Sequence, residues 1–241
     1  MKKSPNEFSF WEHLEELRGR LIKCLWAILA GAVFAYIFID VFFTMLIKPI
    51  GKLVFTCPSD AFTAKMNVAL LGGVFFAFPV ILYQFWRFVS VSLSDQEKRY
   101  ILFYGPCSLI LFLLGSLFAY FVMVPMAVKF LLSYSTDYLV PMITVKEYIS
   151  FCLSLLLAFG IVFLLPLILM FLTSIGIATP EFLAQKRRHA IVLILIVSAI
   201  LTPPDAASQL MMAAPLLALY EIGIVMSRLS YGSHTFKKES L

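Results

Sequence analysis

The sequence contains few charged residues. Asp, Glu, Lys and Arg make up only 14% of its 241 residues, while 61% are hydrophobic and the mean hydropathy is +0.94. A typical soluble domain has about 25% charged residues, which it needs to cover its surface. This composition excludes an ordinary soluble domain and predicts an integral membrane protein.

Paired cysteines are also missing. The four cysteines are Cys24, Cys57, Cys107 and Cys152; none forms a C-x-x-C pair, and three lie inside apolar runs. Isolated cysteines in apolar runs usually behave as small buried hydrophobic residues. We therefore expect neither a zinc site nor a disulfide framework.

The common catalytic motifs are absent as well. The sequence has no H-E-x-x-H zinc motif, no G-x-S-x-G nucleophile turn and no G-x-x-x-x-G-K-[ST] phosphate loop. The three histidines, at positions 13, 189 and 234, lie far apart in the sequence. Hence no enzymatic activity, no metal and no cofactor is expected.

The net charge of +5 does not indicate a nucleic-acid partner. The basic residues form short clusters between apolar runs rather than one stripe, which is typical of the ends of membrane helices. Fourteen of the 19 Lys and Arg residues lie on the side of the two termini if the chain crosses the membrane six times. Because basic residues accumulate on the cytoplasmic side, both termini are predicted to be cytoplasmic.

Six apolar stretches define the predicted architecture. The first four can cross the hydrocarbon core of ~30 Å, since about 20 helical residues suffice. The last two contain 15 uncharged residues each, which is about 22 Å of helix. The predicted fold class is a membrane all-α protein with six transmembrane helices, the last two short. It is predicted to form one integral membrane domain over 1–241, with spans at 21–43, 66–86, 100–128, 148–179, 190–204 and 206–227.

The two short stretches allow a second interpretation. They are separated by Pro203, Pro204 and Asp205, which cannot continue a helix. A re-entrant hairpin would leave the termini on the same side, as two short spans would, so the charge count does not separate the two. We favour two spans, because the turn is charged and prolines deep in hydrocarbon would leave carbonyls unsatisfied.

Helix-start signals stand at the predicted cytoplasmic ends. Ser9 to Glu12 has the form of a capping box, and Phe10, Leu14, Leu17 and Leu21 then repeat at helical spacing. This pattern predicts an amphipathic interfacial helix before the first span.

Further signals of this kind lie at 94–97, a second capping box, and at 179–181, a threonine cap followed by proline. The fourth span is too long to stand upright and straight, so a bend at Pro166 or a tilt is expected.

Acidic side chains gather at the predicted cytoplasmic face, where they could receive a basic ligand: Glu12, Glu15, Glu16, Asp95 and Glu97. Without catalytic motifs, the candidates are a solute transporter, a scaffold and a receptor or translocase for polypeptides. A secondary transporter of a small solute remains the alternative, although the spans have almost no ionisable residue at mid-depth and the halves show no clear repeat.

Several motifs resemble the TatC family, the signal-peptide receptor subunits of the twin-arginine protein translocase. They cover nearly the whole chain in order: His-Leu-Glu-Glu-Leu-Arg at 13–18, the stretch 79–86, Glu97 with basic neighbours, 118–121, 158–160 and Leu-Thr-Pro-Pro-Asp at 201–205. The resemblance implies a bacterial cytoplasmic (inner) membrane location. It also implies export of folded proteins driven by the proton-motive force.

The resemblance further implies that Glu16 and Glu97 are the carboxylates that bind the paired arginines of the signal peptide. An arginine guanidinium pairs bidentately with a carboxylate in a way that lysine cannot reproduce. Glu15 and Arg18 are expected to support this site, Arg18 by orienting Glu15 or by contacting lipid phosphate. Purely structural roles compete, because Glu16 stands four residues before Arg20 and Glu97 could close its capping box.

Other implied features concern partners. Pro203, Pro204, Asp205 and Gln209 are expected to have structural roles or to contact partners near the two short helices. There the family docks single-span TatA- and TatB-type subunits in an oligomeric complex, among membrane lipids.

Two positions depart from the family pattern. Leu164 stands where many members have a glutamate in the fourth helix, and Val91 replaces a proline before Glu97. No role that depends on either family residue is carried over.

Overall fold

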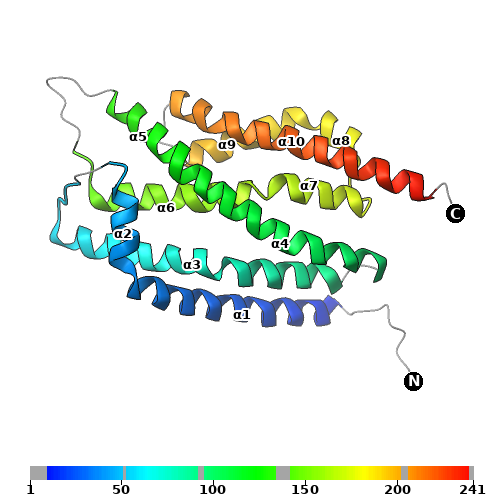
Figure 1. Cartoon of the computed structure of the whole chain (residues 1–241), viewed down its shortest axis with the longest axis horizontal. Helices are drawn as coiled ribbons and strands as arrows, with labels where there is room; N and C mark the ends of the chain where they lie inside the picture. The colour runs from blue at the N-terminus through cyan, green and yellow to red at the C-terminus, as the bar shows by residue number, and fades with distance from the viewer. Residues whose placement is uncertain (1–9, 51–52, 92–94, 134–141, 202–205, 239–241) are drawn as a thin grey trace. The chain divides into compact units, whose positions relative to one another are not determined.

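The computed structural model describes residues 10–50, 53–91, 95–133, 142–201 and 206–238, with only the backbone for residues 10–13, 91, 95–102, 230 and 232–238. Every named element in this part of the chain is helical (Figure 1). In order they are α1 (Phe10–Ile37), α2 (Ile39–Ile47), α3 (Pro58–Val91), α4 (Asp95–Phe118), the π-helical turn η1 (Ala119–Met123), α5 (Val124–Leu132), α6 (Val145–Val162), α7 (Leu165–Ser174), α8 (Pro180–Gln185), α9 (Arg187–Leu201) and α10 (Ala206–Lys238).

Within the residues that the structure describes, five helical segments are long and apolar enough to cross a membrane. They are Leu14–Ile37, Pro58–Ser90, Phe103–Leu132, Val145–Ser174 and Ala206–Leu229. The remaining predicted span corresponds to α9, which has 15 residues and is about 22 Å long. The all-α membrane fold is thus confirmed, with α9 short as predicted. The last span is not short, in contrast to the prediction, because its candidate segment Ala206–Leu229 has 24 residues and α10 continues to Lys238.

Two irregularities within the apolar segments stand just before a proline. The fourth predicted span is interrupted where a bend or a tilt was expected: α6 ends at Val162 and α7 begins at Leu165, with Pro166 in its first turn. The third predicted span contains the π-helical turn η1 immediately before α5, which carries Pro125 near its start. A proline has no N–H to donate to the preceding turn, so the regular ladder changes there.

The helix-start signals can be compared with the observed ends. Thr179 caps α8 as predicted, with its hydroxyl accepting a hydrogen bond from the Phe182 N–H at 3.2 Å. The capping residues Ser9 and Ser94 lie outside the described residues, although α1 and α4 begin directly after them. The amphipathic segment at the chain start is continuous with the first span, because α1 runs unbroken from Phe10 to Ile37.

The contacts divide the chain into two compact units, one made of Met1–Met45 and Ala61–Leu109, the other of Leu46–Asp60 and Ile110–Leu241. In the first unit, α1 and α3 approach closely at glycines. A Cβ built on Gly31 would lie 2.6 Å from the Gly73 carbonyl oxygen, and one on Gly73 would lie 2.6 Å from the Ala32 nitrogen. Since both obstacles are backbone atoms, side chains cannot move aside to make room. Small residues at this crossing allow the two backbones to pack directly.

In the second unit, α10 packs against α7, α8 and α9 (Figure 1). Buried hydroxyl groups join these helices: Thr173 and Ser227 share a hydrogen bond of 2.5 Å, and Tyr220 donates to the Leu183 carbonyl at 2.8 Å. A hydrogen bond between helices specifies which faces meet, which a uniformly apolar contact does not.

The glycine crossing yields a test with an internal control. Gly73→Ala should lower the melting temperature of the purified protein in detergent, because the added Cβ meets backbone atoms of α1 and overpacking costs about 1–3 kcal/mol. Gly105→Ala, in α4, adds a Cβ that meets nothing within 4 Å, so it should be neutral or stabilising. Equal effects of the two substitutions would contradict the proposed crossing.

Candidate functional site

Glu16 lies on α1, in the first unit, within an ion pair. The Nε of Arg20 donates to its Oε1 at 3.1 Å, and the Nη2 of Arg20 donates to the same oxygen. The side chains of Glu16 and Arg20 are 27% and 11% exposed. The pairing at i,i+4 expected from the sequence is present, and because both bonds use Oε1, Arg20 makes no hydrogen bond to Oε2.

The structure describes the side chains of Glu15 and Arg18, but not that of Glu97. Glu15 and Arg18 are exposed on α1. Glu97 lies in the first turn of α4 and belongs to the same unit as Glu16, but its side chain is outside the described residues. The convergence of Glu16 and Glu97 on one ligand therefore stays a prediction.

A buried aromatic cluster joins the end of α3 to α4, the helix that carries Glu97. The rings of Trp86 and Tyr104 stack with centroids 5.5 Å apart and planes 18° apart. The Trp86 indole N–H donates to the Ser108 hydroxyl at 3.1 Å, and that hydroxyl donates to the Gly105 carbonyl at 2.6 Å. These contacts fix the middle of α4 against the end of α3.

Sequence reasoning missed this cluster. In the sequence, Trp86 is equally compatible with an interfacial anchor and with a binding residue. In the structure, however, only 3% of it is exposed. Tyr83, by contrast, is exposed and lies under the Arg87 guanidinium, 6.0 Å from the ring centroid. A serine within an apolar run, such as Ser108, was the signal that could have indicated a polar partner for the indole.

The residues near the two short predicted spans are partly described. Gln209 donates its side-chain N–H to the Leu195 carbonyl at 3.0 Å, which links α10 to α9. Pro203, Pro204 and Asp205 lie outside the described residues. Leu164, at the family's glutamate position, is buried at the break between α6 and α7.

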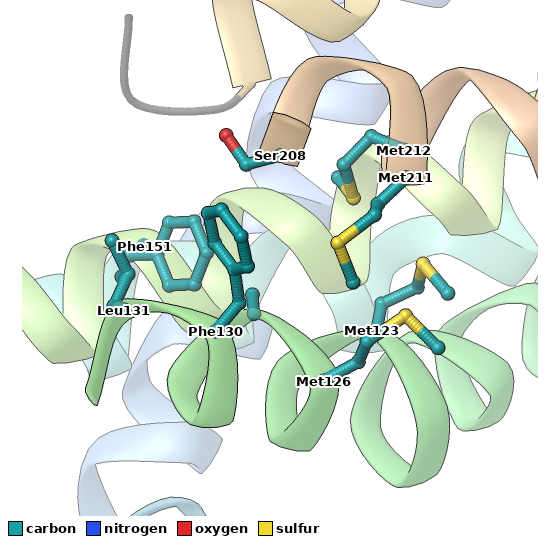
Figure 2. A pocket seen from close by; sticks show the side chains of 9 residues that line it. Met123, Met126, Phe130, Leu131, Phe151, Ser208, Met211 and Met212 are labelled. Atoms are coloured by element: carbon teal, nitrogen blue, oxygen red, sulfur yellow. The ribbon is translucent and has the colours of Figure 1, made fainter. Parts of the chain in front are cut away.

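An apolar groove lies between α5, α6 and α10 of the second unit. Figure 2 shows Met211 and Met212 of α10 on one side of it, with Met123, Met126 and Phe130 on the other. Ser208 is its only polar residue, and no ionisable side chain lines it; Ala127, Leu131 and Phe151 complete the wall. Such a groove offers no group for acid–base chemistry, and flexible methionines suit apolar contacts of variable shape. Among the described residues, no group of three His, Cys, Asp or Glu side chains could hold a metal ion.

Comparisons with known proteins agree on one family. The model of the family described as Sec-independent protein translocase protein (TatC) matches residues 12–215. The chain is 41% identical to the TatC protein of Carboxydothermus hydrogenoformans over 225 residues, which cover 91% of this chain and 93% of that one. It is 42% identical to that of Aquifex aeolicus over 227 residues, covering 91% and 94%.

A solved structure is similar as well. A crystal structure described as the twin-arginine translocase receptor TatC superposes with a TM-score of 0.84 at 41% identity. The match covers 91% of this chain and 99% of that one.

The Trp86 cluster can be tested by a conservative truncation. Ser108→Ala removes the hydrogen-bond acceptor of a buried indole, so it should destabilise the protein by about 1–3 kcal/mol. The control is Ser90→Ala, since Ser90 donates to the carbonyl of Arg87 in its own helix, in a solvent-exposed hydrogen bond, and should change stability by less than about 0.5 kcal/mol. Thermal unfolding of both variants in the same detergent measures the difference, and a Ser108→Ala protein as stable as the control would refute the role of the cluster.

Proposed function

Because the chain belongs to the TatC family of Sec-independent protein translocase proteins, we propose that it is the receptor that binds the twin-arginine signal peptides of folded proteins. It is a multi-pass protein of the bacterial cytoplasmic (inner) membrane. Its relatives are named as translocase components rather than as solute transporters.

The observation that carries this proposal is the geometry of Glu16. Its carboxylate is half-buried but accessible, and the bonds from Arg20 occupy Oε1 only. Oε2 is thus the oxygen that a guanidinium of the signal peptide would approach. A charge-assisted hydrogen bond of this kind contributes about 1.5–3 kcal/mol, so two such carboxylates would distinguish a paired arginine from a single one.

Glu97 is proposed as the second carboxylate, in the first turn of α4. The Trp86 cluster supports this role, because it orients α4 without itself being exposed to a ligand. Glu15 and Arg18, both exposed on α1, are proposed to support the peptide contact or to face lipid headgroups. The ion pair between Glu16 and Arg20 is compatible with this role, since it orients the carboxylate.

The membrane arrangement and partners follow from the same proposal. The chain crosses the membrane six times with α9 as a short span, and both termini are cytoplasmic. TatA- and TatB-type single-span subunits dock beside α9 and the start of α10, where Pro203, Pro204, Asp205 and Gln209 lie. A short span favours local thinning of the bilayer. Transport is driven by the proton-motive force within an oligomeric complex.

Peptide binding is tested by replacing each carboxylate with its amide. Glu16→Gln and Glu97→Gln should each reduce photo-crosslinking of a twin-arginine signal peptide to the full-length protein by at least tenfold, because the charge-assisted bonds are lost (about 1.5–3 kcal/mol each). Glu147→Gln, in the first turn of α6, is the matched control and should have no effect.

A peptide with both arginines replaced by lysine should crosslink weakly to every variant. Undiminished crosslinking in both Glu16→Gln and Glu97→Gln would refute the site, provided that both proteins are inserted and folded. Export of twin-arginine cargo that persists after deletion of the gene would instead favour the small-solute transporter.

The role of Arg20 can be separated from that of Glu16. If Arg20 orients the carboxylate, Arg20→Met should weaken peptide binding severalfold, with Arg20→Lys intermediate because lysine lacks the guanidinium fork. Lys23→Met removes an exposed charge from the same helix and should leave binding unchanged. Fluorescence anisotropy of a labelled peptide gives the affinities. Tighter binding by Arg20→Met would show that Arg20 competes with the peptide.

A further inference from the structure

Three consecutive basic residues stand at the turn between α8 and α9 in the second unit. Lys186, Arg187 and Arg188 are all exposed. The turn lies between α7, which ends one candidate span, and α9, whose residues 190–201 contain no ionisable side chain. We refer to these three residues as the basic turn.

Contacts within the unit hold the basic turn in place. The Arg187 Nη2 donates to the Glu221 carboxylate of α10 at 2.7 Å, and the Tyr220 hydroxyl donates to the Leu183 carbonyl of α8 at 2.8 Å. Thr179 caps the start of α8. The helices on both sides of the turn are therefore bonded to α10, α9 through Arg187 and α8 through Leu183.

The charge of the turn is only partly compensated. Glu221 of α10 pairs with Arg187, and Glu181, in the first turn of α8, is the one acidic residue of that helix. Lys186 and Arg188 form no ion pair with another described residue. The Lys186 ammonium instead lies 5.5 Å from the centroid of the Phe182 ring, which leaves it able to bind an anion.

Exposed apolar side chains precede and follow the basic turn in the sequence. Ile177 is 71% exposed, Phe182 is 51% exposed, and Val192 of α9 is exposed as well. Exposed apolar side chains would contribute nothing to the binding of a soluble anion or a nucleic acid. A phospholipid matches both parts, because its phosphate can meet the basic side chains while its acyl chains cover the apolar ones.

We infer that the basic turn is a binding site for the phosphate headgroup of an anionic phospholipid, with Lys186 and Arg188 as the residues that contact the phosphate. Phe182 positions Lys186 and lies against the acyl chains, and Arg187 fixes the turn to α10. The lipid therefore anchors the junction of α8, α9 and α10 at the membrane surface. This role does not depend on Glu16 or Glu97.

Lipid retention by the purified full-length protein tests the inference. In native mass spectrometry, the protein should retain phosphatidylglycerol in preference to phosphatidylcholine with the same acyl chains. The double variant Lys186→Gln/Arg188→Gln should bind phosphatidylglycerol at least tenfold more weakly, since each basic residue near an anionic lipid contributes about fivefold. Its binding of phosphatidylcholine should not change.

Matched controls separate the site from general charge effects. Lys48→Gln/Lys129→Gln removes two exposed basic residues from the same unit and should leave phosphatidylglycerol binding unchanged. The charge-preserving pair Lys186→Arg/Arg188→Lys should retain it, which also shows that the turn still folds. Equal losses in both glutamine pairs, full retention by Lys186→Gln/Arg188→Gln, or displacement of the lipid by inorganic phosphate alone would each overturn the inference.

Discussion

Hydrocarbon offers no hydrogen-bond partners to the backbone, and the rest of this structure depends on that constraint. Each apolar segment must bond its own N–H and C=O groups, which a helix does. The described elements are accordingly helices. Where proline removes a donor, the helix changes locally. The helices α6 and α7 are separated by a short break before Pro166, and the π-helical turn η1 precedes Pro125. Pro79 and Pro106 are instead accommodated inside α3 and α4.

Association of these helices relies on close approach and on a few polar contacts, since lipid chains are as apolar as the helices themselves. In the first unit the glycines of α1 and α3 bring two backbones together. In the second, hydroxyl groups of Thr173, Ser227 and Tyr220 specify how α10 meets α7 and α8. Each unit thus uses its few polar or small residues where orientation matters.

Most charged side chains in the described part of the chain lie toward the ends of the apolar segments, where some of them have both structural partners and a proposed role in recognition. Glu16 is oriented by Arg20 through a single oxygen, which is compatible with a second guanidinium. Arg187 is bound to Glu221, whereas Lys186 rests over an aromatic ring. The same chemistry that sets the orientation of the chain in the membrane therefore also supplies the candidate contacts for a peptide and for a lipid.

The sequence by itself determined the membrane all-α class, the short helix α9, an irregularity at Pro166 and the cap at Thr179. These follow from hydropathy, length and backbone chemistry, which act within a few residues along the chain. It also indicated the pairing of Glu16 with Arg20, because i,i+4 neighbours meet on any helix. Only the tertiary structure decided that Trp86 is buried against Tyr104, that Thr173 meets Ser227 and that Arg187 pairs with Glu221. Helical periodicity says which residues share a face, but the partner of that face depends on packing between segments far apart in the sequence.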